Sequence, residues 1–201
     1  MKPTPKHCSP YLCSTLATTS KPKPTVTCLF MVDYQSSGIS ASAIVTYKAY
    51  WNFAMLVASK LNDASRFTGY PDSFGYASGI SNHSRYPVNS YNVFKEVPMP
   101  ADDLDDEIDL DLKDVDSTLA QASWQPSSQD QTCLIFFSAA VEAEYGGTTI
   151  KTTYDNFATV VGVLLGGAPS IPGLTDPVIA TNLSDSEAQA VVQKLLDSLT
   201  D

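Results

Sequence analysis

TVTCLFMVDYQSSGIS, residues 25–40, is the stretch that decides the fold. Its first half, Val26–Val32, is almost entirely apolar, which predicts a strand buried in a sheet. The strand leads into Asp33, hydroxyl side chains and a glycine, and a long segment without glycine or proline favours a helix over residues 42–62. Ligands of open α/β sheets bind where parallel strands end. This strand end is therefore the first candidate for a functional site.

The remaining apolar runs predict a parallel sheet. Cys133–Phe137 and Thr159–Leu165 are continuous apolar runs of the kind found in central strands buried on both faces. Further strands are expected over 66–70, which Pro71 ends, over 91–97, where polar and apolar residues alternate, and over 178–181. Residues 71–92 are expected to form loops around one short strand. Strands that alternate with helices indicate an α/β fold, a central mostly parallel sheet with helices on both faces.

Four further helices complete the expected pattern. The last opens at Ser184 and contains Glu187 three residues later, which is a capping box, and it runs to about residue 199. Apolar residues at 104, 108, 112, 115 and 119 predict an amphipathic helix with aspartates on its wet face. Shorter helices are expected over 117–123, within the same stretch, and over 150–157.

The charge of the chain is concentrated in one block. The net charge is −10, and nine of the 22 acids with a single lysine lie between Asp102 and Asp116, which leaves −2 for the rest. The chain has no basic stripe to neutralise phosphates, so nucleic acid is excluded as a partner. The acidic block is either a site for calcium or a basic partner or, as we expect because no EF-hand spacing accompanies it, a solvated helix face.

Composition and cysteines suggest an extracellular protein. We expect a Pro/Lys/Thr-rich flexible segment over 1–24, followed by one domain over 25–201, in a chain of 201 residues. Apolar runs are too short for a membrane span, and the first residues lack the apolar core of a signal peptide. An even set of four cysteines and two Asn-x-Ser glycosylation candidates, Asn82 and Asn182, favour secretion without a leader in this chain.

Motifs for catalysis are weak. Gly75-Tyr-Ala-Ser-Gly79 has its serine one place too late for a nucleophile elbow, and a Ser-His-Asp triad would depend on His83, because His7 lies in the first segment. We therefore expect a protein that is not an enzyme and has no cofactor. A serine-dependent α/β hydrolase and a purely structural interaction domain are the alternatives.

Tyrosines suggest a recognition surface. The loop-rich stretch contains Tyr70, Tyr76, Arg85 and Tyr86 among Gly, Ser and Asn, a composition typical of protein-binding surfaces. The alternative is that some of these rings pack against neighbouring strands.

The order of motifs resembles a von Willebrand factor A domain. The resemblance covers residues 25–201 and is carried by CLFMVDYQSSGIS, CLIFFSA, TVVGVLLGG and VIATNLSDSEAQAVVQKLLDSL, with a long helix after the first of them. It implies an extracellular adhesion or recognition module that binds a protein or matrix component. The family binds Mg²⁺ or Mn²⁺ through an Asp-x-Ser-x-Ser turn, a threonine and a second aspartate.

This resemblance assigns a degenerate metal site. Asp33 and Ser37 match the ends of the family's turn, Gln35 replaces its middle serine, and Thr118 is the candidate threonine. Ser138 stands where the second aspartate is expected, so one carboxylate is missing and ion binding should be weak.

The same resemblance suggests how the cysteines pair. It makes the strands that contain Cys28 and Cys133 neighbours, with both cysteines at equivalent depth. A Cys28–Cys133 disulfide is therefore expected, which leaves Cys8 with Cys13. Two buried free cysteines are the alternative to the first bridge.

Overall fold

A five-stranded parallel sheet organises the described part of the chain. The computed structural model describes residues 22–76, 91–99, 104, 106–122 and 129–199. Its strands are β1 (Thr25–Tyr34), β2 (Arg66–Gly75), β3 (Gln131–Ser138), β4 (Thr159–Leu165) and β5 (Val178–Ala180). Their order is β2-β1-β3-β4-β5, and every pairing is parallel. The predicted α/β fold class is therefore confirmed.

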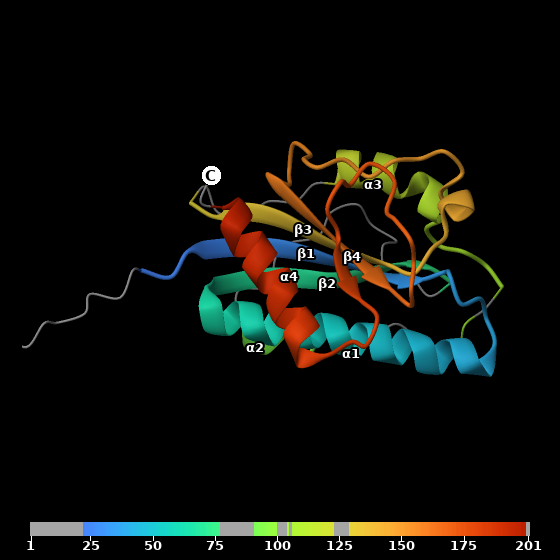
Figure 1. Ribbon diagram of the computed structural model, residues 1–201, viewed down its shortest axis with the longest axis horizontal. Coiled ribbons are helices and arrows are strands. Elements are labelled where there is room, and N and C mark those ends of the chain that lie inside the picture. Colours follow the sequence, from blue (N-terminus) through green and yellow to red (C-terminus); the bar gives the residue numbers. More distant parts are fainter. Residues whose placement is uncertain (1–21, 77–90, 100–103, 105, 123–128, 200–201) are drawn as a thin grey trace, which may run out of the picture.

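Helices cover both faces of this sheet (Figure 1). The helices are α1 (Ala41–Ala64), α2 (Tyr91–Phe94), α3 (Val115–Gln121) and α4 (Asp185–Ser198), with 3₁₀ turns η1 (Leu112–Asp114) and η2 (Glu142–Tyr145). One core joins α1, α2 and α4 to one face, and a second core joins α3 and the loops after β3 and β4 to the other. The sheet is thus the middle of three layers.

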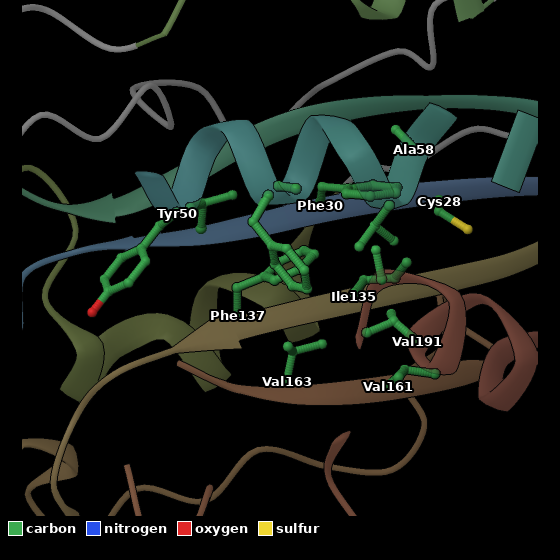
Figure 2. Close-up of a cluster of buried hydrophobic side chains, with 14 of the residues drawn as sticks. Cys28, Phe30, Tyr50, Ala58, Ile135, Phe137, Val161, Val163 and Val191 are labelled. Carbon is green, nitrogen blue, oxygen red and sulfur yellow. The ribbon is translucent and has the colours of Figure 1, made fainter. Parts of the chain in front are cut away.

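The larger core follows from the alternation of side chains along β1, β3 and β4. Phe30, Ile135, Phe137 and Val163 point to the same face, where α1 and α4 bury them (Figure 2). Successive strand residues point to opposite faces, so the intervening Leu134 and Phe136 belong to the second core. The middle of each central strand is therefore apolar on both faces, as in a doubly covered strand.

The two long helices begin at caps that the sequence specifies. Ser40 accepts a hydrogen bond from the Ala43 N–H at the start of α1. At the start of α4, Ser184 and Glu187 form the predicted capping box. Each cap satisfies N–H groups that have no partner inside the helix, and a cap of this kind contributes about 1 kcal/mol.

A disulfide joins the two central strands. Cys28 and Cys133 pair in register, their Cα atoms are 4.4 Å apart, and both residues are fully buried. The predicted Cys28–Cys133 bridge is therefore present. The expected Cys8–Cys13 bridge lies outside the described residues.

The second strand is longer than predicted. β2 continues through Pro71 and ends at Gly75. The prediction that Pro71 stops it is wrong because β2 lies at the edge of the sheet, where the missing N–H interrupts no ladder. At Gly75 the chain takes a positive φ of 111°, and a side chain there would meet the Tyr34 carbonyl oxygen at 2.4 Å.

The expected strand over 91–97 is a short helix instead. Tyr91 and Phe94 are three residues apart on α2, so one helical face presents both to the core, and Val97, after the helix, packs against the same core. The ring of Phe94 lies 5.1 Å from those of Phe30 and Phe67. Packing of these aromatic rings therefore overrides the local alternation that suggested a strand.

The acidic amphipathic helix forms only in its last third. Leu110 pairs with Gly75 in an isolated antiparallel bridge, Asp111 caps η1, and α3 begins at Val115. Aspartates compete with the helix by bonding nearby backbone groups, as the Asp111 carboxylate does with the Lys113 N–H. The short helix expected over 117–123 corresponds to α3, although α3 begins and ends two residues earlier.

The short helix expected over 150–157 is also absent. Ile150, Tyr154 and Phe157 are buried at helix-like spacing, but the Ile150 N–H donates to the Pro172 carbonyl, and Tyr154 pairs with Phe157 in an antiparallel bridge. Their spacing reflects an irregular segment that closes the second core.

None of the helices in the described residues is long and apolar enough to cross a membrane.

Candidate functional site

The candidate site lies where β1 and β3 end side by side. The strand order places these neighbours at the point where the chain turns from one half of the sheet to the other. Open α/β sheets bind ligands at the carboxyl end of such a switch point. Here the segment 33–38 contains the end of β1 and the turn after it, and the segment 138–148 contains the end of β3 and the loop after it.

Asp33 holds the two strand ends together. Its Oδ1 accepts hydrogen bonds from the N–H groups of Gln35 (2.9 Å) and Ser36 (3.0 Å). Its Oδ2 accepts from the Ser36 hydroxyl (2.6 Å) and from the Ala139 N–H (2.7 Å), which follows β3. A carboxylate offers about four acceptor positions, and protein donors occupy all of them.

Burial and hydrogen bonding act in opposite directions on this acid. Asp33 is fully buried, and the loss of water raises its pKa. The bonds from Ser36, Ala139 and Gln35 favour the charged form, but the net shift of the pKa is upward. Backbone N–H groups and one hydroxyl thus stabilise the charged form of Asp33.

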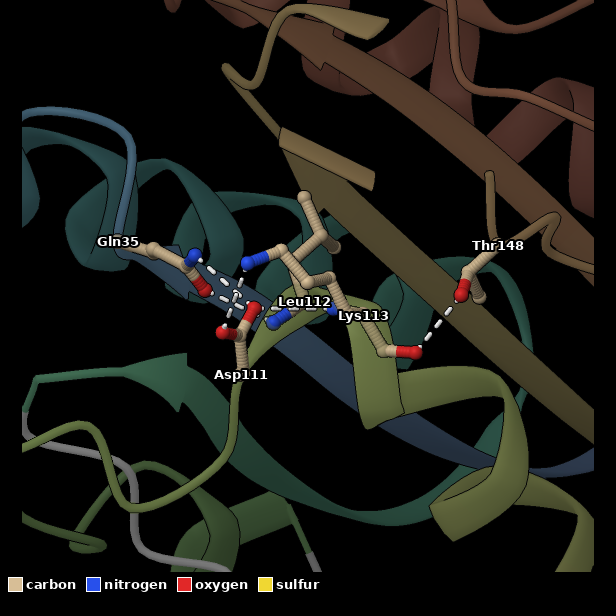
Figure 3. Close-up of polar contacts among 5 residues, drawn as sticks. All are labelled: Gln35, Asp111, Leu112, Lys113 and Thr148. Atoms are coloured by element: carbon tan, nitrogen blue, oxygen red, sulfur yellow. Dashed lines mark hydrogen bonds and ion pairs between the residues drawn. The ribbon is translucent and has the colours of Figure 1, made fainter. Parts of the chain in front are cut away.

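Gln35 connects the β1 end to the acidic segment, as Figure 3 shows. Its amide nitrogen donates to Asp111 Oδ1 (3.2 Å), and its amide oxygen accepts from the Leu112 N–H (2.8 Å). We refer to these two bonds as the Gln35 clamp. They fix a segment 76 residues away in the chain to the candidate site.

The acidic segment has one further contact with the loop after β3. The Thr148 hydroxyl donates to the Lys113 carbonyl at 2.7 Å, while within the segment Asp111 accepts from the Lys113 N–H (Figure 3). Burial alone would raise the pKa of Asp111, but the bonds from Lys113 and Gln35 outweigh it, and the pKa is lowered. The acidic segment is therefore part of the carboxyl edge rather than a separate solvated helix.

A second carboxylate, which the sequence analysis did not identify, approaches Asp33. Glu144 lies on η2, and its side chain is near enough to Ser36 and Asp33 for both to affect its pKa. Burial raises the pKa of Glu144, the polar side chain of Ser36 lowers it, and the charge of Asp33 raises it further. The sequence contained no signal for this contact because it depends on where η2 lies.

Ser138 has a structural role. Its hydroxyl oxygen accepts from the Tyr145 hydroxyl (2.8 Å) and from the Ala140 N–H (3.2 Å), and Ser138 is fully buried. These bonds fold the segment after β3 back onto the strand end. A buried serine with these partners is closed to a substrate.

The residues present do not assemble the metal site implied by the von Willebrand factor A resemblance. The acceptor positions of Asp33 are filled, and Gln35 is bound to Asp111 and Leu112. The Ser37 N–H donates to the Tyr47 hydroxyl. Thr118 is buried on α3. In the described ranges, no three His, Cys, Asp or Glu side chains are grouped so that they could hold a metal ion.

Other predicted site residues are scattered. Tyr70 packs against the second core, and Tyr76 is half-buried next to the end of β2, with its N–H bonded to the Tyr34 carbonyl. Arg85 and Tyr86 lie outside the described residues, as does the glycosylation candidate Asn82. Asn182 is exposed between β5 and α4.

Comparison with known proteins finds similar structures at low sequence identity, but no matching family model or curated protein. Proximal thread matrix protein 1 from the mussel byssus aligns with TM-score 0.45 and 14% identity, over 89% of this chain and 49% of that one. A conserved hypothetical protein, BatB from Bacteroides thetaiotaomicron, aligns with TM-score 0.48 and 11% identity, over 88% of this chain and 100% of that one. The chain thus spans about half the length of the mussel protein, and likeness at this level supplies no argument about function.

Proposed function

We propose that this chain is a non-enzymatic, extracellular recognition module that binds a protein or matrix partner through its carboxyl edge. The observation that carries the proposal is the closed candidate site: its polar groups bind one another, so the edge offers a preformed surface instead of a reaction centre. A rigid surface loses little entropy when a partner binds.

Exposed apolar residues on the same edge support a binding role. Ile39 follows the β1 turn and is 47% exposed, and Val141 follows β3 and is 51% exposed. Ile108, in the acidic segment beside Gly75, is also exposed. Apolar side chains among acidic ones are suited to a partner surface that combines apolar and basic groups.

The chemistry of the site supports a role other than catalysis. Ser36 is the serine that contacts Asp33, and no histidine lies in the described part of the chain to act as a general base for it. The carboxylate of Asp33 is buried behind its own donors. We infer that the module also works without a bound ion, since the family's donor set is not assembled around Asp33.

The buried disulfide supports an extracellular location. Disulfides form and persist in secreted proteins and are rare in reducing compartments. Cys28 and Cys133 are both fully buried, which protects their bond from soluble thiols.

A pair of valines with equal exposure tests the binding surface. Val141 at the carboxyl edge and Val93 on α2 are both 51% exposed. The labelled full chain is applied to decellularised extracellular matrix, and its retention is compared for wild type, Val141→Asp and Val93→Asp. We expect at least a tenfold loss for Val141→Asp and none for Val93→Asp. Equal retention of all three proteins would contradict binding through this edge.

Two further measurements distinguish the alternatives. A fluorophosphonate probe should leave the protein unlabelled, and stoichiometric labelling would instead favour the serine-dependent hydrolase. Titration with Mg²⁺, Mn²⁺ and Ca²⁺ at millimolar concentration should leave the melting temperature unchanged, because an ion bound to the folded state alone would raise it.

A further inference from the structure

The turn between β5 and α4 displays a glycosylation tripeptide. Asn182, Leu183 and Ser184 lie between the end of β5 at Ala180 and the start of α4 at Asp185. Asn182 is exposed, and within the described residues its side-chain amide makes no hydrogen bond. The amide nitrogen to which a glycan would attach is therefore accessible.

Glu187 fixes the backbone of this tripeptide. Its Oε1 accepts from the Asn182 N–H (3.1 Å), and its Oε2 accepts from the Ser184 N–H (2.7 Å) and the Ser184 hydroxyl (2.7 Å). Leu183 takes a positive φ of 52° and packs against the larger core. The turn thus anchors its apolar residue while Asn182 remains in solvent.

The neighbouring strand has an open edge. In the described part of the sheet β5 pairs with β4 alone. Ile179 on β5 is 66% exposed, whereas Leu164, its register partner on β4, is 5% exposed. Unpaired strand edges with exposed apolar side chains favour pairing between molecules, and proteins protect them by covering or charging the edge. The shortness of β5 limits this hazard but leaves Ile179 uncovered.

We propose that Asn182 carries an N-linked oligosaccharide that covers the open edge of the sheet at β5. Asn182 follows Ile179 by three residues, at most about 10 Å of extended chain, which is within the reach of a branched glycan. The Cys28–Cys133 bridge is consistent with passage through the oxidising secretory compartment, where such glycans are attached. This inference rests on the proposed extracellular location but not on binding of a partner through the carboxyl edge.

The modification requires a lipid-linked oligosaccharyl diphosphate as co-reactant. Asn182 Nδ2 forms a bond to the anomeric carbon of the oligosaccharide, and the bond from that carbon to the diphosphate oxygen breaks. The lipid diphosphate leaves with the electron pair, and the amide gives up one proton to the transferring enzyme. The product keeps the Asn182 backbone N–H that bonds to Glu187.

Mass spectrometry of the full chain, secreted from eukaryotic cells, tests the attachment. Asn182→Gln should lose the mass of one glycan while it keeps the wild-type melting temperature, because the backbone N–H remains. Ser184→Thr should keep both the glycan and the helix cap, whereas Ser184→Ala should lose both. Asn82→Gln, which removes the other tripeptide, should leave the glycan at Asn182 in place. A peptide map in which Asn182 is unmodified would overturn the proposal.

Light scattering at matched concentrations tests whether the glycan covers the edge. The glycosylated protein should be monomeric, Asn182→Gln should shift towards dimers or larger species, and the double variant Asn182→Gln/Ile179→Lys should return to the monomer. If Asn182 carries a glycan but Asn182→Gln stays as monomeric as wild type, the covering role is wrong.

Discussion

The two ends of the β1–β3 strand pair are joined by different chemistry. Towards the amino ends, the Cys28–Cys133 disulfide links the strands covalently within the larger core. At the carboxyl ends, the Asp33 carboxylate accepts the Ala139 N–H and also holds the loop after β1. A buried disulfide contributes in the same way at all ordinary pH values, whereas a buried carboxylate responds to protonation and to its donors. The link at the amino ends thus mainly stabilises the fold, whereas Asp33 at the carboxyl ends mainly fixes the position of the loop after β1.

The largest effect should follow from removing the covalent link. Cys28 and Cys133 are 105 residues apart in the chain, and a loop of this length closed by a disulfide stabilises a fold by about 4–5 kcal/mol through the unfolded state. We expect Cys28→Ala/Cys133→Ala to lose about that much free energy of unfolding, measured by urea denaturation.

The second cysteine pair supplies the control for this variant. Cys8→Ala/Cys13→Ala alters the short first segment and should leave the midpoint in urea almost unchanged. A Cys28→Ala/Cys133→Ala protein as stable as wild type would show that the amino ends of the strands do not need the link.

Removing the acceptor at the carboxyl end should cost less. Asp33→Asn keeps one oxygen but turns an NH₂ group towards two half-buried donors, the Ser36 hydroxyl and the Ala139 N–H. A donor without an acceptor costs about 1–3 kcal/mol when it is buried and less when water can reach it, so we expect a loss of about 2 kcal/mol in urea denaturation at pH 7. Asp176→Asn, at a side chain that is 86% exposed, should change stability by less than about 0.5 kcal/mol. Equal effects of the two variants would contradict the role of Asp33.

The Gln35 clamp should have a local effect. Gln35→Glu keeps the acceptor for the Leu112 N–H but places a second carboxylate against Asp111. We expect a loss of about 1 kcal/mol and faster amide hydrogen exchange over residues 110–116, because one charge-assisted bond becomes a repulsion.

Gln193 on α4 offers a matched comparison, since its amide also donates to an aspartate, Asp197, but on an exposed helix face. Gln193→Glu should change stability by about 0.5 kcal/mol or less and leave exchange at 110–116 unaltered. Unchanged exchange in Gln35→Glu would mean that the clamp does not hold the acidic segment.

The smallest effect concerns pH. Burial raises the folded-state pKa of Glu144 above its ordinary 4.5, so the folded protein binds its proton more tightly than the unfolded chain does. The resulting stability is present below pH 4.5 and is lost as pH rises through the raised pKa. Glu144→Gln should reduce this slope to the part that Asp33 contributes, because the pKa of Asp33 is raised as well. It should stabilise the protein at pH 7 by less than about 1 kcal/mol, because water screens a partly exposed group.

Urea denaturation at several pH values between 4 and 7 measures this slope. Glu142→Gln, at an exposed acid on the same 3₁₀ turn, should keep it. The same slope in wild type and Glu144→Gln would exclude Glu144 as its source.

Sequence patterns predicted the central elements well. β1, β3 and β4 each contain a continuous apolar run, and α4 carries a complete capping box, so local composition predicts these elements. The predictions failed where a distant partner decides the conformation. The 91–97 segment is helical because Phe94 enters an aromatic cluster, and the acidic segment is extended at Leu110 because Gly75 pairs with it.

The sequence by itself determined the parallel sheet, its two long helices and an acid at the end of β1. The tertiary structure alone decided the hydrogen-bond partners of Asp33 and Gln35. Asp33 bonds to Ala139, which lies 106 residues away in the chain, and Gln35 bonds to Asp111, which lies 76 residues away. Periodicity records which side chains are buried, because burial is a property of each residue in turn. It does not record which distant polar groups meet, because a hydrogen bond requires two groups to be placed within about 3 Å by the whole fold.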